Sequence, residues 1–214
     1  MTSPDPNKAV YRLLEEQVQQ RYPDLRLVGE NGKHSLCGSF PIEHDERVLD
    51  RFSIEISFPQ GPNGLPDITE TAHRIPRTRE RHINPDGTIC TEVPEIWLLK
   101  GKKSLLDYLD GPVRNYFLGQ LLVEQGELWP FGEWDHGKLG LLQAYGELLG
   151  VEGETAIRRL SDCLSHKKVK AHWACPCGSG KQIRSCHLAG LRRLHQRIPP
   201  RIARQALERL NQQS

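Results

Sequence analysis

The sequence predicts an α+β protein in which an antiparallel meander sheet with flanking helices precedes a small C-terminal module. Strand patterns occur early in the chain and helical patterns occur later, and no internal repeat or low-complexity segment interrupts that order. Three of the six cysteines also lie within twelve positions, from Cys175 to Cys186, in the last fifth of the chain. A chain of 214 residues can hold one medium domain with such an appendage.

The first elements are a helix and a group of strands. Apolar residues recur at helical spacing from Asn7 to Tyr22, and Pro23 then ends the helix. Strands are expected at residues 25–28, 34–42 and 51–59. The third alternates apolar and polar residues, so one face of the sheet is buried and the other is wet. Residues 67–81 are polar and irregular, which predicts a loop.

Helices fill the remainder. Ser104 is the expected N-cap of a helix that runs to about Glu124, because apolar residues again recur at helical spacing. Further helices are expected at residues 138–149 and 154–165, and after Pro200. We therefore divide the chain into a main domain (1–150), a helical linker (151–172), a cysteine-rich knuckle (173–190) and a basic C-terminal helix (191–214).

Charge is distributed unevenly along the chain. Residues 157–214 contain thirteen Lys or Arg and two Asp or Glu, a net charge of +11. Residues 1–156 contain sixteen basic and twenty-five acidic residues, a net charge of −9. A basic tail on an acidic body indicates either contact with a polyanion or an acidic protein surface, or a solvated helix pair. Nucleic acid is the less favoured partner, because Trp173 alone in the tail offers an aromatic ring for base stacking.

The chain contains no run of about 18 apolar residues, so no transmembrane helix and no membrane partner are expected. Its N-terminus lacks the basic start and apolar run of a signal peptide. We therefore expect a cytoplasmic protein. In that reducing compartment, clustered cysteines indicate a metal site and not disulfide bonds.

The segment Cys175-Pro-Cys177-Gly-Ser-Gly-Lys-Gln-Ile-Arg-Ser-Cys186-His187 supplies four metal ligands. Zinc prefers four such ligands in a tetrahedron, and a site closed by four protein ligands is structural. The glycines that follow Cys177 allow a tight turn that returns the second pair of ligands to the first. The alternative is three unrelated buried thiols. The pattern resembles the SEC-C motif, in which Cys-x-Cys-Gly-Ser-Gly-Lys precedes a basic stretch and a Cys-Cys or Cys-His pair. One Zn²⁺ is therefore expected on Cys175, Cys177, Cys186 and His187.

A second motif lies between Phe52 and Cys90. A strand that ends in Phe-Pro is followed by a Gly/Pro loop, by Leu-Pro-Asp-Ile and by His82-Ile-Asn84-Pro-Asp-Gly-Thr-Ile-Cys90. In this order the elements resemble ubiquitin-conjugating enzymes, and the resemblance covers about residues 7–125. It implies a UBC-like fold with Cys90 as the acyl-carrying thiol. In the family an Asn stands eight residues before the cysteine, whereas here His82 holds that place and Asn84 stands six residues before it.

The eukaryotic enzymes of this family lack such a zinc module. With it, the chain is more similar to bacterial relatives in ubiquitin-like conjugation operons, including those beside cyclic-oligonucleotide antiphage systems. The resemblance implies a transferase that receives a ubiquitin-like modifier from an activating enzyme as a thioester on Cys90. The modifier would pass to a target amine in antiviral defence, for example on a cyclic-oligonucleotide synthase. His82 is a candidate oxyanion donor or base, Asn84 a candidate oxyanion donor or loop pin, and His136 a second candidate or a packing residue.

Two other functions stay open. The first is a catalytically inactive binding module that recruits a ubiquitin-like protein, with Cys90 in its core. The second is a nucleic-acid or ribosome-associated protein whose basic zinc tail is the functional part. Near the cysteine, Asp86 is expected to be a turn residue. Glu92 and Glu95 are expected either to orient an acceptor amine or to be ordinary exposed loop acids. The two isolated cysteines, Cys37 and Cys163, are expected in the core.

Overall fold

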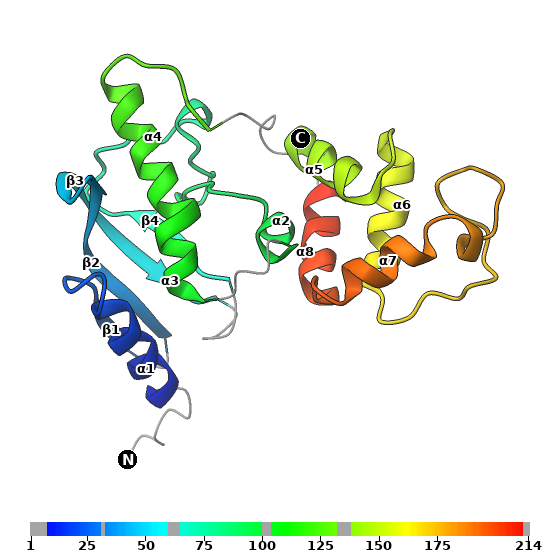
Figure 1. Ribbon diagram of the computed structural model, residues 1–214, viewed down its shortest axis with the longest axis horizontal. Helices are drawn as coiled ribbons and strands as arrows, with labels where there is room; N and C mark the ends of the chain where they lie inside the picture. Colours follow the sequence, from blue (N-terminus) through cyan, green and yellow to red (C-terminus); the bar gives the residue numbers. More distant parts are fainter. Residues whose placement is uncertain (1–7, 31–32, 60–64, 100–103, 132–137, 212–214) are drawn as a thin grey trace. The chain divides into compact units, whose positions relative to one another are not determined.

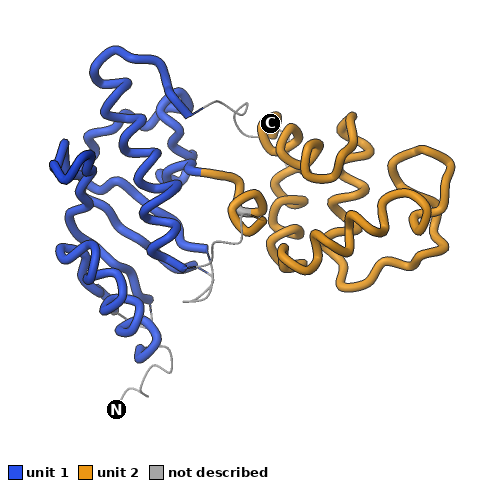
Figure 2. Tube along the Cα trace, in the orientation of Figure 1, with its two compact units in different colours: residues 1–91, 103–131 blue, residues 92–102, 132–214 orange. Residues whose placement is uncertain are grey.

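The computed structural model describes residues 8–30, 33–59, 65–99, 104–131 and 138–211 and divides the chain into two compact units (Figure 2). Unit 1 comprises residues 1–91 and 103–131, and unit 2 comprises residues 92–102 and 132–214. This division does not coincide with the boundary that we drew at residue 150. Helix α5 (Lys138–Leu149) belongs to unit 2, because it packs on helices α6 and α8 of that unit.

Unit 1 contains a four-stranded antiparallel sheet in the order β1-β2-β3-β4, so the α+β class and the antiparallel meander are confirmed (Figure 1). The strands are β1 (Arg26–Glu30), β2 (Lys33–His44), β3 (Arg47–Ser57) and β4 (Asp67–Glu70). The alternation in β3 places Phe52, Ile54 and Ile56 on the buried face. Phe40 of β2 pairs with Phe52, which brings two large rings together on that face.

Helices cover the buried face of the sheet. They are α1 (Lys8–Gln19), α3 (Leu105–Tyr108), a π-helical turn η2 (Leu109–Val113) and α4 (Arg114–Glu124). Phe117 of α4 contacts the sheet, with its ring centroid 4.5 Å from that of Phe52 and 5.8 Å from that of Phe40. Ser104 caps this helical segment as expected, since its side chain accepts from the backbone N–H of Asp107. Pro112 lies inside the π turn, where the expected single helix is interrupted.

The fourth strand corrects the expectation that residues 67–81 are irregular throughout. β4 pairs with β3 and buries Ile68 and Glu70. The Glu70 carboxylate accepts from the backbone N–H groups of Ala72 and Arg74 at 2.8 and 2.9 Å, so an inward-facing acid closes the turn after the strand. Only residues 71–81, including the short 3-10 helix η1 (Arg79–Arg81), continue as loop.

The described residues of unit 2 form helices joined by loops, with one isolated bridge. Its helices are α2 (Pro94–Leu99), α5, α6 (Glu154–Ser165), α7 (Leu188–His195) and α8 (Pro200–Asn211). The two helices expected at 138–149 and 154–165 have the expected bounds, α2 was not expected, and α7 overlaps the start of the expected basic C-terminal helix. Helix α6 packs on α8 and α7, and α2 packs on α8. The basic segment 191–214 is therefore not one helix, because α7 ends at His195 and α8 begins at Pro200.

Candidate functional site

The cysteine-rich segment folds back on itself before the second ligand pair. A bridge joins Ala174 to Gln182, and the backbone N–H of Cys175 donates to the carbonyl of Lys181 at 2.7 Å. Gly178 and Gly180 both have positive φ, +85° and +71°, as the sequence predicts for this turn. The 3-10 helix η3 (Ile183–Ser185) and the start of α7 then flank the second ligand pair. Short-range backbone contacts thus bring the second pair of ligands back to the first pair.

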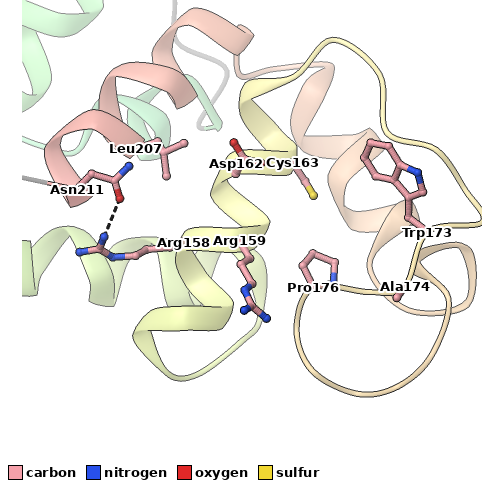
Figure 3. Close-up of a pocket in the computed structure, with 9 residues that line it drawn as sticks. All are labelled: Arg158, Arg159, Asp162, Cys163, Trp173, Ala174, Pro176, Leu207 and Asn211. Carbon is pink, nitrogen blue, oxygen red and sulfur yellow. Dashed lines mark hydrogen bonds between the residues drawn. The ribbon is translucent and has the colours of Figure 1, made fainter.

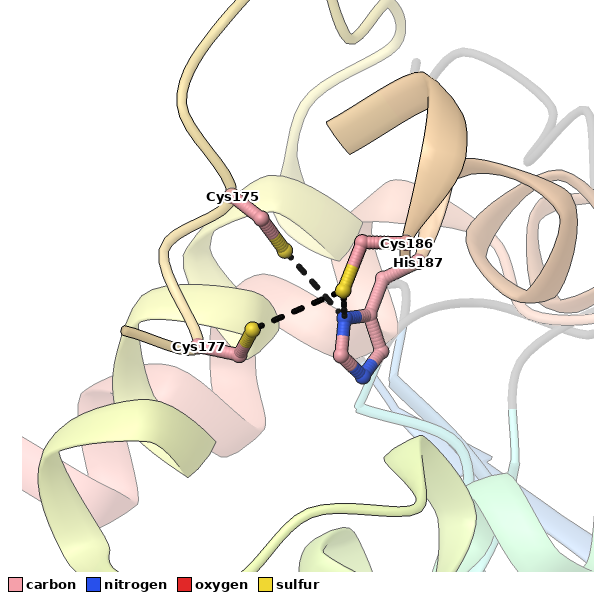
Figure 4. A group of neighbouring side chains, drawn as sticks. All are labelled: Cys175, Cys177, Cys186 and His187. Atoms are coloured by element: carbon pink, nitrogen blue, oxygen red, sulfur yellow. Dashed lines mark hydrogen bonds between the residues drawn. The ribbon is translucent and has the colours of Figure 1, made fainter. Parts of the chain in front are cut away.

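Figure 4 shows four side chains that point toward one another: Cys175, Cys177, Cys186 and His187. All their ligand atoms lie within 4.8 Å of one another. The Sγ atoms of Cys177 and Cys186 are 3.7 Å apart, and Nδ1 of His187 lies 3.2 Å from Sγ of Cys175 and 3.1 Å from that of Cys186. Metal–sulfur bonds of about 2.3 Å in a tetrahedron place two sulfur atoms about 3.8 Å apart. The cluster can therefore hold a metal ion.

The thiols of this cluster have different acidities. Burial and the neighbouring thiols raise the pKa of Cys175 to about 12. A hydrogen bond with Ser179 lowers the pKa of Cys177 to about 6. A bound cation favours the thiolate form of every cysteine that ligates it, including the buried one. The donor set and its geometry therefore fit a metal that accepts three thiolates and one imidazole.

The Cys90 segment forms a small hairpin against the edge of the sheet. The backbone N–H of Cys90 donates to the carbonyl of His82 at 2.7 Å, and a bridge joins Ile83 to Ile89. The N–H of Ile89 donates to the carbonyl of Ile68 in β4 at 2.8 Å. Ile83 and Ile89 of the hairpin are buried, whereas Cys90 is exposed. The hairpin thus anchors the loop through apolar residues and leaves the cysteine at the surface.

Hydrogen bonds within the loop fix its tip. The Asn84 side-chain amide donates to Oγ1 of Thr88 at 2.9 Å, and Oδ1 of Asp86 accepts from the backbone N–H of Thr88 at the same distance. Gly87 has φ +90°, so Asp86 precedes a left-handed residue as expected. Of the two alternatives for Asn84, the structure shows a contact that pins the loop.

His82 is buried beside this hairpin, with 8% of its surface exposed. Its ring packs against Trp129, with ring centroids 4.3 Å apart, and its backbone is left-handed with φ +52°. Gly119 of α4 makes room for that indole, since a Cβ at this position would lie 2.7 Å from it. The structure therefore brings the backbones of His82 and Cys90 together, whereas His136 lies outside the described residues.

The two acids after Cys90 differ in environment. Glu95 is fully buried in unit 2, and its Oε1 accepts from the hydroxyl of Tyr145 at 2.5 Å. The expectation that Glu95 orients an amine or is an exposed acid is therefore wrong. Glu92 is partly exposed. The sequence did not indicate the Glu95–Tyr145 pair or the packing of Trp129 on His82, because each joins residues about fifty positions apart.

The two remaining cysteines only partly match the expectation that both lie in the core. Cys163 is buried in α6, whereas Cys37 on β2 is only half-buried.

No protein-family model, curated protein or solved structure matches the chain. Among the described helices, none is both long and apolar enough to cross a membrane. The cysteine cluster and the Cys90 hairpin are therefore the features from which function is inferred.

Proposed function

We propose that this protein is a ubiquitin-conjugating-like transferase that carries a ubiquitin-like protein as a thioester on Cys90. The observation that carries the proposal is the exposed Cys90 thiol on a hairpin hydrogen-bonded to the fourth strand of an antiparallel meander. In unit 1, helix α1 precedes that sheet and the helical segment formed by α3, η2 and α4 follows the cysteine, in the order that the resemblance implies. An accessible thiol on an irregular segment is what acyl transfer between two macromolecules requires.

The chemistry consists of two acyl transfers. The Cys90 thiolate attacks the thioester carbonyl that links the modifier to its activating enzyme, and the enzyme's thiol leaves. A target amine then attacks the new thioester, the Cys90 thiolate leaves, and the amine loses a proton. Each step passes through a tetrahedral oxyanion, which a nearby hydrogen-bond donor stabilises. In bacterial antiviral defence the target would be a protein such as a cyclic-oligonucleotide synthase.

The cysteine cluster supports a second part of the proposal, one structural Zn²⁺ on Cys175, Cys177, Cys186 and His187. Three thiolates and an imidazole form a ligand set that zinc prefers, and four protein ligands leave no coordination position for a substrate. The metal would fix the turn between Cys177 and Cys186 and take no part in acyl transfer.

Thioester formation tests the proposal directly. The full chain is incubated with an activating enzyme, a ubiquitin-like modifier and ATP, and the products are separated on gels with and without reductant. We expect a reductant-sensitive adduct with the native chain and with the Cys37→Ala control, and none with Cys90→Ala. Cys90→Ser should give an adduct that resists reductant, because an oxygen ester replaces the thioester. A reductant-sensitive adduct on Cys90→Ala would assign the carrier role to another cysteine.

One pair of contacts favours a second candidate, a module that binds a ubiquitin-like protein without carrying it. The Asn84 amide is bonded to Thr88, and the His82 ring is packed against Trp129, so both polar side chains serve the loop structure. In that case the modifier would bind the Cys90→Ala variant as tightly as the native chain, and no adduct would form on either.

A further inference from the structure

A groove in unit 2 lies between helix α6, helix α8 and the chain that leads into the metal ligands (Figure 3). Its volume is about 510 Å³. The lining residues come from three segments distant in sequence: Arg158, Arg159, Asp162 and Cys163 of α6; Trp173, Ala174 and Pro176; and Leu207 and Asn211 of α8. This groove shares no residue with the Cys90 hairpin or with the four metal ligands.

Part of the lining of the groove is apolar. Trp173 stands at its edge with 46% of its surface exposed, which is high for so large an apolar side chain. Pro176 lies between two of the metal ligands, Cys175 and Cys177, so the metal site fixes that part of the wall. Leu207 of α8 and the buried Cys163 are further apolar lining residues. An apolar side chain from a partner could pack here against the indole ring of Trp173.

Positively charged side chains lie among and beside these apolar residues. Arg158 bonds to Asn211 and to Glu154, so its guanidinium is already held in place. Arg159 is exposed, and no acceptor among the described residues pairs with its guanidinium. Lys170 lies over the Trp173 ring, 5.6 Å from its centroid, and adds a second positive charge beside the indole. Asp162 is the one acidic lining residue, and the segment that builds most of the groove has a net charge of +11.

We propose that this groove binds a short acidic peptide segment of a partner protein. An apolar side chain of the peptide packs on Trp173 and Pro176, and flanking carboxylates pair with Arg159 and Lys170. Charge-assisted hydrogen bonds from a guanidinium to a carboxylate supply the specificity. Single-stranded nucleic acid fits less well, since such binders stack successive bases on several aromatic rings and this groove offers one. The inference does not depend on acyl transfer at Cys90, so the two proposals fail or succeed separately.

Defined peptides test the groove in the full chain. The probe is a fluorescein-labelled peptide of Glu and Asp around one central Trp, and its affinity is measured by anisotropy. Three comparison probes replace the central Trp by Ser, replace the acids by Lys, or substitute an oligothymidylate. We expect the acidic Trp peptide to bind most tightly. Arg159→Glu and Trp173→Ala should each weaken its binding about tenfold, as loss of a central contact typically does.

A charge-matched control separates the groove from the general basicity of the tail. Arg192→Glu makes the same charge change at an exposed position of α7 outside the groove and should leave the affinity nearly unchanged. Equal losses for Arg192→Glu and Arg159→Glu would overturn the proposal, as would equal binding of the Lys or Ser peptide, or binding of the oligothymidylate alone. Metal content and circular dichroism report on folding. If Trp173→Ala loses metal, Arg159→Glu decides, because its position is outside the ligand loop.

Discussion

His82 holds the geometry of the Cys90 hairpin through both its backbone and its ring. Its left-handed backbone is a conformation that histidine adopts more readily than most residues, and its carbonyl accepts from the N–H of Cys90. The ring is fixed by Trp129, which in turn occupies the space left by Gly119. A change at His82 therefore alters loop packing and any proton or hydrogen-bond role together, and an experiment has to separate the two.

Two substitutions at His82 separate these roles. His82→Phe keeps a flat ring against Trp129 but removes the imidazole nitrogens, whereas His82→Ala removes both. If the imidazole stabilises the oxyanion, both variants should load Cys90 normally and discharge the thioester to lysine roughly a hundredfold more slowly. Single-turnover discharge on quenched gels gives both rates. Discharge by His82→Phe at the native rate would leave His82 with a packing role and direct attention to Asn84 or His136.

Glu95 makes the stability of unit 2 depend on pH. Burial raises the pKa of its carboxyl above the ordinary value of 4.5, so the folded chain holds this proton more tightly than the unfolded chain. The stabilisation that this proton gives is fully present below the unfolded pKa and is lost as pH rises through the raised folded pKa. The Tyr145 hydroxyl offsets part of the burial effect by donating to the carboxylate.

Glu95→Gln should remove this pH dependence. Its amide oxygen can still accept from Tyr145, and it carries no charge at any pH. We expect the variant to match the native chain below about pH 4.5 and to become the more stable of the two as pH rises toward neutrality. Urea unfolding of both chains over this range measures the difference, in which titration of the metal ligands cancels. Tyr145→Phe should have the opposite effect at neutral pH. A difference that stays constant with pH would contradict the assignment.

Elements whose signals are local could be predicted from the sequence, and those fixed by tertiary contacts could not. The alternation in β3 and the bounds of α5 and α6 are visible in the sequence, since a single buried face sets the pattern. β4 was missed because it is short and one of its inward residues is Glu70, whose carboxylate is satisfied by backbone N–H groups of the next turn. The π turn around Pro112 was missed because apolar spacing continues through it.

The same distinction applies to the two sites. The metal ligands lie within thirteen positions, so their spacing and the two turn glycines were enough to predict the cluster from the sequence. The groove and the Glu95–Tyr145 pair depend on how distant helices pack, which no motif records. The orientation of the His82 ring likewise depends on Trp129, forty-seven positions later in the chain.

The knuckle should be the metal-dependent element of this protein. We expect one zinc per chain by native mass spectrometry and none in a Cys177→Ser/Cys186→Ser double variant. Apparent binding free energies of roughly 10–16 kcal/mol for small zinc peptides exceed what so short a segment gains from its own packing. A chelator should therefore increase hydrogen exchange in residues 171–195 and leave the strands of unit 1 protected. Freshly purified protein without metal, or uniform exchange after chelation, would contradict this expectation.

The chain crosses between the two units more than once, and this limits where it can be divided. It leaves unit 1 after Thr91, returns at residue 103 and leaves again after Phe131. The segment 92–102 contains α2, which packs on α8 near the C-terminus. Trp97 of α2 is only 3% exposed. The segment immediately after Cys90 is therefore part of the helical core of unit 2.

Truncation tests whether acyl transfer needs unit 2. A chain cut before about residue 170 keeps α5 and α6 but removes α7 and α8, so the apolar face of α6 is uncovered. A cut after residue 131 follows the boundary of unit 1 and leaves α2 without α8, the helix on which it packs. Because Trp97 then loses its partner helix, we expect the 1–131 chain to aggregate and its Trp97→Ser variant to stay soluble.

The soluble 1–131 variant should unfold cooperatively, since unit 1 has its own core, and should form the reductant-sensitive adduct on Cys90. The 1–170 chain should be less soluble than either, because the face of α6 that packs on α8 would meet water. Light scattering, thermal unfolding and the gel assay measure the three properties on the same samples. A folded, monomeric 1–131 variant that fails to load would show that the helical unit is required for transfer.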